Sequence, residues 1–227
     1  MRFVHHDLAT DAEARDFLAS RGVKAAPVTR IDDEIIIGYY PRKLIPALKL
    51  DVKVDLSGRA SWLADKYQRI LGATIRATQQ LSPEQLRTPV SWRPESLRDT
   101  IVHIISFPEL AWRSYQHGSM STDDMQACRE RLQPIQTPGE IAAYGEGVID
   151  DIVAFLHSNN TTGFDRVVPA HYGGEVTVME LLNLILSHST HHLKQVYWFM
   201  ETDLGVTPAQ RATGEDLAGI FTPEALI

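Results

Sequence analysis

The sequence predicts a mainly α-helical protein, an antiparallel four-helix bundle preceded by a small N-terminal α/β segment. In four long stretches after residue 57, apolar residues recur at intervals of three and four, which is the period of a helix with one buried face. Residues 1–50 instead combine short helical stretches with two runs that are rich in β-branched residues. We therefore expect an N-terminal segment at 1–50 and a helical domain at 57–227.

Within the N-terminal segment, cap and turn residues predict the order helix, strand, strand, helix. Thr10 and Glu13 have the spacing of a capping box, and Gly22 is suited to the end of the helix that follows. The apolar runs on either side of Asp32-Asp33 predict a β-hairpin. A last short helix is expected before residue 50.

The helical domain is expected to contain four long helices, at residues 61–81, 96–115, 141–156 and 181–200. Thr177 and Glu180 form a second capping-box pattern before the last of them. Residues 167–176 are expected to form a loop or short hairpin that crosses over before this helix. Four helices joined by loops are typical of an antiparallel bundle.

Composition and charge exclude several classes of protein. The formal net charge is −7, which does not suit binding to a phosphate backbone, so we expect no nucleic-acid partner. The chain has no run of about 18 apolar residues and its first residues are acidic and polar, so we expect no membrane span, no secretory signal and a cytoplasmic location. Cys128 is the only cysteine, which excludes an internal disulfide, a cysteine-based metal site and two-cysteine redox chemistry.

The histidines carry the strongest chemical signal. His188 and His192 are four residues apart, about 40° apart in rotation on one helix face, so two imidazoles can reach one metal ion. His103 lies on the core side of the 96–115 helix, whereas His191 points away from the other two. Three neutral imidazoles leave coordination positions open, as in catalytic metal sites. A hydrogen-bonded core is the alternative that spacing alone leaves open.

These histidines belong to a longer pattern. In order, its features are His103, Trp112 nine residues later, Gly173-Gly174, Thr177, the pair His188 and His192, and Gln195. Over about residues 57–205 the pattern resembles the DinB-like family of four-helix-bundle metalloenzymes. The resemblance implies that His103, His188 and His192 are ligands of one divalent metal, zinc or nickel.

The N-terminal segment carries a second resemblance, over about 45 residues. A helix that ends in Arg-Gly-Val, then Ala26-Pro27-Val28, residues 32–39 and Leu44 resemble the C-terminal half of a glutaredoxin or thioredoxin-like domain. In that family the proline is cis and helps to bind a thiol substrate, so the resemblance makes Pro27 a candidate cofactor-binding residue. Because the family's Cys-x-x-Cys motif is absent, redox catalysis is not implied. A structural appendage, a platform for a thiol or a partner, and a domain truncated at its start are the three open interpretations.

The expected function follows from the open metal site and the two resemblances. DinB-like proteins include thiol S-transferases and isomerases that use low-molecular-weight thiols. We therefore expect a metal-dependent enzyme of the thiol S-transferase, isomerase or hydrolase type that binds a small-molecule substrate or thiol. The alternative is a non-catalytic, metal-stabilised ligand-binding or adaptor protein. A homodimer is compatible with the resemblance, although the sequence shows no distinct interface.

No catalytic residue is identified by the sequence. Asp99, one turn before His103, is a candidate for orienting its ring, but a helix-start carboxylate at this place has an equally simple explanation. Glu109 falls on a different face from His103 and is expected to be solvated. Tyr172, in the crossover, could reach the mouth of the site.

Overall fold

A computed structural model describes residues 3–23, 28–37, 41–52, 56–158, 160–171 and 174–223. The chain separates into two compact units, Met1–Val54 and Asp55–Ile227, which are described in turn. In the described residues, no helix combines the length and the apolar character that crossing a membrane requires.

The first unit contains α1 (Ala12–Ala19), β1 (Val28–Ile31), β2 (Glu34–Ile37) and α2 (Pro41–Ala47). The expected hairpin is confirmed, because β1 and β2 pair antiparallel around Asp32-Asp33 and Asp32 takes a positive φ of 51°. The expected cap is wrong by one residue. Asp11, not Thr10, accepts the hydrogen bond from the Ala14 amide, since Asp11 directly precedes the first helical residue. Pro27 lies outside the described residues.

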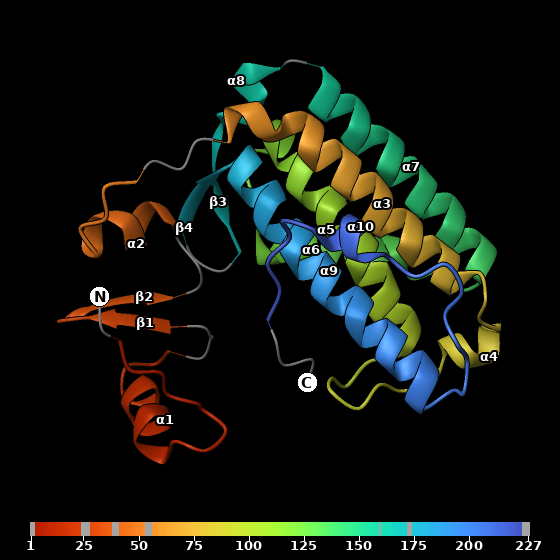
Figure 1. Ribbon diagram of the computed structural model, residues 1–227, viewed down its shortest axis with the longest axis horizontal. Helices are drawn as coiled ribbons and strands as arrows, with labels where there is room; N and C mark the ends of the chain where they lie inside the picture. Colours follow the sequence, from red (N-terminus) through yellow and green to blue (C-terminus); the bar gives the residue numbers. More distant parts are fainter. Residues whose placement is uncertain are drawn as a thin grey trace. The chain divides into compact units, whose positions relative to one another are not determined.

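The second unit is mainly helical. Its elements in chain order are η1 (Ser57–Arg59), α3 (Ala60–Thr78), α4 (Pro83–Leu86), α5 (Leu97–His117), α6 (Thr122–Leu132), α7 (Pro138–His157), α8 (Thr161–Phe164), β3 (Val167–Ala170), β4 (Gly174–Thr177), α9 (Val178–Thr202) and α10 (Gly214–Leu217). The four long helices α3, α5, α7 and α9 match the expected helical stretches, and Figure 1 shows them lying alongside one another. The crossover is an antiparallel hairpin of β3 and β4.

Capping boxes explain where these helices begin. Before α9, the Thr177 hydroxyl accepts from the Glu180 amide, and the Glu180 carboxylate accepts from the Thr177 amide, as the sequence predicts. The same reciprocal arrangement precedes α5 and α7. The helix α6 was not predicted from the sequence, since it is more polar than the four long helices and buries only its Cys128 and Leu132 positions.

The long helices do not all run antiparallel to their neighbours. Tyr67, in the first half of α3, donates a 2.6 Å hydrogen bond to the carbonyl of Leu182, near the start of α9, and Figure 1 shows these two helices running in the same direction. Tyr115 stacks on Phe155, and both lie near the ends of α5 and α7, so these helices also run in parallel. The physical reason is α6, an additional helix between α5 and α7 that allows the chain to return before α7 starts.

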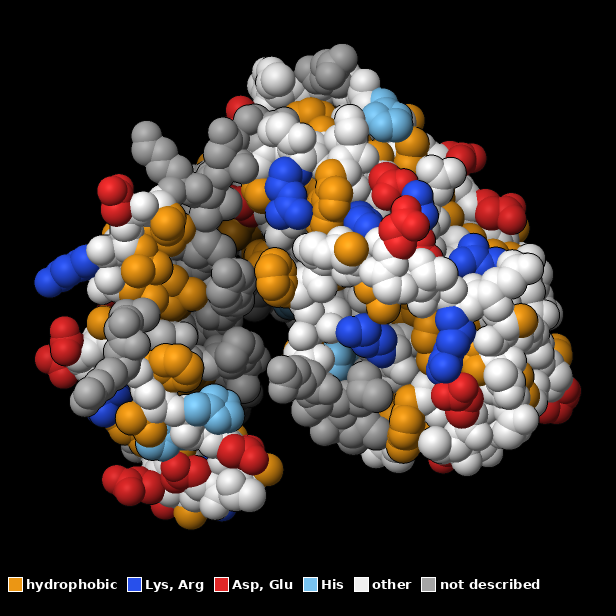
Figure 2. All heavy atoms as spheres, in the orientation of Figure 1, with side chains coloured by type: hydrophobic (Ala, Val, Ile, Leu, Met, Phe, Trp, Pro, Cys, Tyr) orange, Lys and Arg blue, Asp and Glu red, His pale blue; other side chains and the backbone are white. Residues whose placement is uncertain are grey.

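The other two neighbouring pairs are antiparallel, as expected. Gly145, near the start of α7, packs against Ile75, near the end of α3, and a Cβ built on this glycine would meet the Ile75 side chain at 3.0 Å. The pair of α5 and α9 is antiparallel as well, since Trp92, shortly before α5, packs against Trp198 and Phe199 near the end of α9. This pair positions the histidines. On the face of the helical unit shown in Figure 2, acidic and basic side chains are interspersed.

Candidate metal site

Helices α5 and α9 are joined at the level of the histidines by a side-chain hydrogen bond. Pro108 lies inside α5 and has no N–H, so the carbonyl of Ile104 lacks its usual donor four residues later. The buried Ser189 hydroxyl of α9 donates to this carbonyl at 2.9 Å. Because Ile104 follows His103 and Ser189 follows His188, this bond fixes the two histidine backbones side by side.

Three histidine rings converge at this level. Nε2 of His103 lies 2.8 Å from Nε2 of His188, within hydrogen-bond distance, so these two ring nitrogens face each other between the two helices. The His192 ring centroid lies 4.5 Å from that of His188 and 5.1 Å from that of His103. One ring nitrogen from each residue lies within 4.8 Å of the other two. His192 is buried, whereas His103 and His188 are half-buried and border solvent.

The orientation of His192 is set by a neighbour on its own helix. Its Nδ1 lies 2.5 Å from Oε1 of Gln195, less than one turn further along α9. An amide oxygen can only accept a hydrogen bond, so Nδ1 carries the hydrogen and Nε2 keeps its lone pair. The same Nε2 lies 3.3 Å from Nη2 of Arg93, which donates to it.

Burial keeps these rings neutral. It is the main cause that lowers the pKa of His103 to about 2, of His188 to about 3 and of His192 to about 4. The positive charge of Arg93 lowers all three pKa values further, while the Gln195 hydrogen bond partly opposes the shift at His192. Neutral imidazole is the form that binds metal, so the rings are in the ligand form at neutral pH.

The nitrogen positions fit a divalent ion. Nitrogens bound to zinc at about 2.0–2.1 Å in a tetrahedral arrangement lie about 3.4 Å from each other. The observed 2.8 Å between the His103 and His188 nitrogens and the 4.8 Å limit for the trio bracket this value. Small rotations of the rings would therefore bring three ligand atoms to one ion, with the remaining coordination positions open.

Comparison with protein families shows which family the chain belongs to. The family described as the DinB superfamily matches residues 66–196, which is more than half of the 227 residues and includes all three histidines. The chain belongs to the DinB superfamily. Comparisons with curated proteins and with solved structures gave no match.

In this DinB-superfamily protein, further side chains around the histidines were not anticipated from the sequence. Phe107 packs with its ring centroid 3.8 Å from that of His103 and stacks on His188 at 5.3 Å. His171, directly after the crossover strand β3, packs edge to face with Phe107 at a distance of 5.7 Å between ring centroids. Phe107 could have been found, because it lies four residues after His103 and therefore on the same helix face. Arg93 lies in the loop before α5, and His171 lies in the crossover hairpin. Neither residue is in a helix, so helical spacing could not have placed them beside the histidines.

The two carboxylates considered near His103 have other roles. Asp99 accepts from the amide and hydroxyl of Ser96 and pairs with Arg98, so it caps α5, which was the alternative explanation for it. The expectation that Glu109 is solvated is wrong, since only 3 % of its side chain is exposed. It accepts hydrogen bonds from Arg131 of α6 and Tyr144 of α7, and these helices cover the face of α5 on which Glu109 lies. Tyr172 lies outside the described residues.

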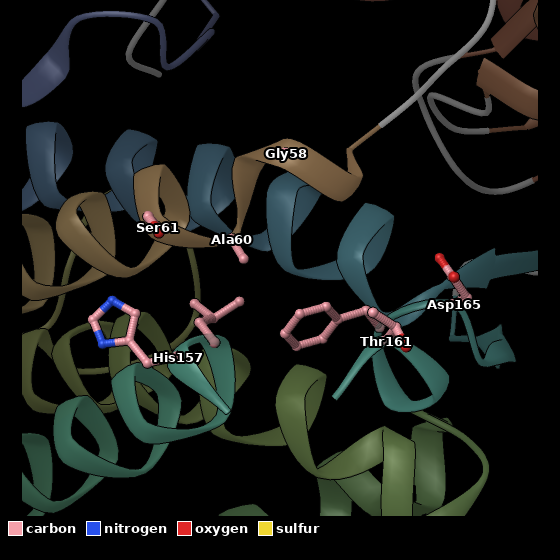
Figure 3. Close-up of a pocket in the computed structure, with 8 residues that line it drawn as sticks. Gly58, Ala60, Ser61, His157, Thr161 and Asp165 are labelled. Carbon is pink, nitrogen blue, oxygen red and sulfur yellow. The ribbon is translucent and has the colours of Figure 1, made fainter. Parts of the chain in front are cut away.

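A separate pocket lies where α3 begins and α7 ends, lined by residues from these helices and α8. It contains a serine, a histidine and an aspartate, but Figure 3 shows His157 and Asp165 at opposite ends of it. These residues therefore do not form a hydrogen-bonded catalytic triad, which needs the histidine within reach of the carboxylate. The pocket shares no lining residue with the histidine cluster.

Proposed function

We propose that this protein binds one divalent metal ion, zinc or nickel, through His103, His188 and His192. The observation that carries the proposal is the convergence of three neutral imidazoles from α5 and α9. The hydrogen bond between Gln195 and Nδ1 of His192 leaves the lone pair of Nε2 for a metal. Metal binding is also a property of the DinB superfamily to which the chain belongs. Imidazole ligation suits several divalent ions, and zinc and nickel are both among them.

We further propose that the site is that of a thiol S-transferase, an isomerase or a hydrolase in a DinB-type four-helix bundle. A divalent ion on three neutral ligands keeps its full charge and can activate a bound water or thiol. The protein's own groups hold His192 in one tautomer, shield one side of the cluster with Phe107 and leave His103 and His188 in contact with solvent. A low-molecular-weight thiol is the proposed co-substrate.

Two finer parts of the proposal concern the rest of the chain. We propose that the N-terminal segment is related to glutaredoxin-like domains and serves either as a structural appendage or, with Pro27, as a platform for a thiol or a partner. The helical unit alone is also compatible with a homodimer. In the described residues, Tyr197 and Phe199 are buried by the chain itself, with the Ala212 amide donating to the Tyr197 hydroxyl, so these aromatic side chains do not supply the interface.

Metal analysis of protein purified without a histidine tag tests the proposal. We expect about one equivalent of zinc or nickel per chain in the wild type and a loss of metal in His188→Ala. His191→Ala is the matched control, because its ring lies beside His192 but it does not belong to the converging trio. Wild-type protein without stoichiometric metal, or equal metal content in both variants, would contradict the metal site.

Catalysis needs a separate test. The metal-loaded protein is screened with low-molecular-weight thiols and electrophilic substrates, and thiol consumption is measured. Metal-dependent turnover that His188→Ala loses supports the transferase. Retained metal without turnover and without thiol binding favours the alternative, a non-catalytic metal-stabilised ligand-binding or adaptor protein.

A further inference from the structure

A basic side chain lies directly beside the histidine cluster, since Nη2 of Arg93 is 3.3 Å from Nε2 of His192. The charge of Arg93 lowers the pKa of all three rings, and the charge of Arg129 lowers the pKa of His103. A divalent ion on three neutral imidazoles would add two more positive charges beside Arg93. A ligand that carries negative charge is therefore the kind that this environment stabilises.

Arg93 is held next to the cluster by its own loop. The preceding residue, Trp92, packs edge-on against Trp198 and Phe199 of α9, with ring centroids 6.2 and 5.6 Å apart. The loop is closed by a β-bridge between Pro89 and Ser96. The backbone of Arg93 is thereby fixed relative to α9, and its guanidinium needs little ordering when a ligand binds.

The present contacts of the Arg93 guanidinium leave it donors for a ligand. Nη2 donates to Nε2 of His192 at 3.3 Å, and Nη1 lies 3.9 Å from Oε1 of Glu95, which already accepts a 3.0 Å hydrogen bond from Thr100. A guanidinium has five N–H groups, and 37 % of the Arg93 side chain is exposed. The Nε2 lone pair of His192 cannot serve Arg93 and a metal ion at once. A metal ion held by this Nε2 would therefore replace the hydrogen bond and leave Nη2 free to donate to a ligand.

We propose that Arg93 binds the carboxylate of a small anionic thiol or substrate whose other functional group reaches the three-histidine site. The inference rests on the proposed metal site and names the class of ligand that it takes. Guanidinium and carboxylate groups match as paired, charge-assisted hydrogen bonds, which a lysine cannot reproduce with the same geometry. Arg93 is thus a specificity residue that selects ligands with a carboxylate close to the metal-binding group.

A cobalt-substituted protein tests this without relying on turnover. Thiolate binding to cobalt(II) changes the visible absorption spectrum, so mercaptoacetate and 2-mercaptoethanol can be titrated at one pH. These thiols are similar in size, but only the first carries a carboxylate. We expect Arg93→Ala to lower the preference for mercaptoacetate over 2-mercaptoethanol by about tenfold, the effect of one charge-assisted hydrogen bond, and Arg93→Lys to lower it less.

Arg129→Ala is the matched control, because it removes the same charge from an exposed residue of α6 whose field reaches His103. Its preference should stay within about twofold of the wild type, since field effects across solvent are weak. Equal losses in Arg93→Ala and Arg129→Ala, or an unchanged preference in Arg93→Ala that still binds cobalt, overturn the role of Arg93 and leave the metal site intact. Failure of the wild type to bind cobalt overturns the metal site, and the role of Arg93 falls with it.

Discussion

The hydroxyl of Ser189 donates a 2.9 Å hydrogen bond to the carbonyl of Ile104, which the proline four residues later leaves without a helical donor. The two groups are buried, so neither has water as a substitute partner. This bond links α5 to α9 one residue away from His103 and His188. The carbonyl that Pro108 leaves free in α5 thus takes part in aligning the two helices that carry the histidines.

Ser189→Ala is expected to lower the free energy of unfolding by about 1–2 kcal/mol, because it leaves the Ile104 carbonyl buried without this donor. Pro108→Ala restores a backbone N–H that can donate to the same carbonyl. The cost of Ser189→Ala should therefore be smaller in the Pro108→Ala background. Urea unfolding of the two single variants and the double variant measures this coupling. Equal costs in both backgrounds would contradict the shared carbonyl.

Gln195→Ala is expected to weaken metal affinity by about tenfold, because the tautomer and the orientation of His192 lose their support. The affinity is measured by competition with a chelator of known strength. Gln195→Glu is the informative comparison, since a carboxylate can still accept from Nδ1 and should retain more of the affinity. If both variants bind as tightly as the wild type, the contact between His192 and Gln195 does not orient the ligand.

The metal-free protein should lose stability as the pH falls. The pKa values of His103, His188 and His192 are lowered in the folded chain, to about 2, 3 and 4, from the ordinary value of 6.5. Below about pH 6.5 the unfolded chain therefore binds more protons than the folded chain, and the free energy of unfolding decreases as the pH falls from about 6.5 toward about 4. Each ring contributes at most about 1.4 kcal/mol per pH unit.

Urea unfolding of chelator-treated protein between pH 7.5 and 5 measures this loss. His188→Gln removes one of the rings that must stay neutral, so its stability should depend less steeply on pH than that of the wild type. Parallel pH curves for the two proteins would show that the buried histidines do not set the acid sensitivity.

Two glycines of α7, Gly145 and Gly147, test whether α3 and α7 approach each other closely. Gly147 has open space around a Cβ position, so Gly147→Ala should raise the free energy of unfolding by up to about 1 kcal/mol through helix propensity. Gly145→Ala has the same propensity gain, but its Cβ would meet Ile75 at 3.0 Å and Ile105 at 3.3 Å. We expect it to be less stable than Gly147→Ala in thermal unfolding. Equal gains would mean that the helices do not meet closely at Gly145.

Local signals determined much of this structure. Helical periodicity placed the four long helices, the Thr177 and Glu180 pair marked the start of α9, and the four-residue spacing put His188 and His192 on one face. These properties depend on residues within one turn of each other, which is why a sequence shows them without knowledge of the fold. The two-aspartate turn of the N-terminal hairpin belongs to the same class.

Other features were decided by tertiary structure. The parallel direction of α5 and α7 follows from α6, whose weak apolar pattern hid it in the sequence. Glu109 is buried because Arg131 and Tyr144 come to it from two other helices, and Arg93 reaches His192 from a loop that has no helical phase. Spacing paired His188 with His192, but only the packing of α5 against α9 brings His103 to them, because the direction and depth of a contact between helices depend on every residue at their interface.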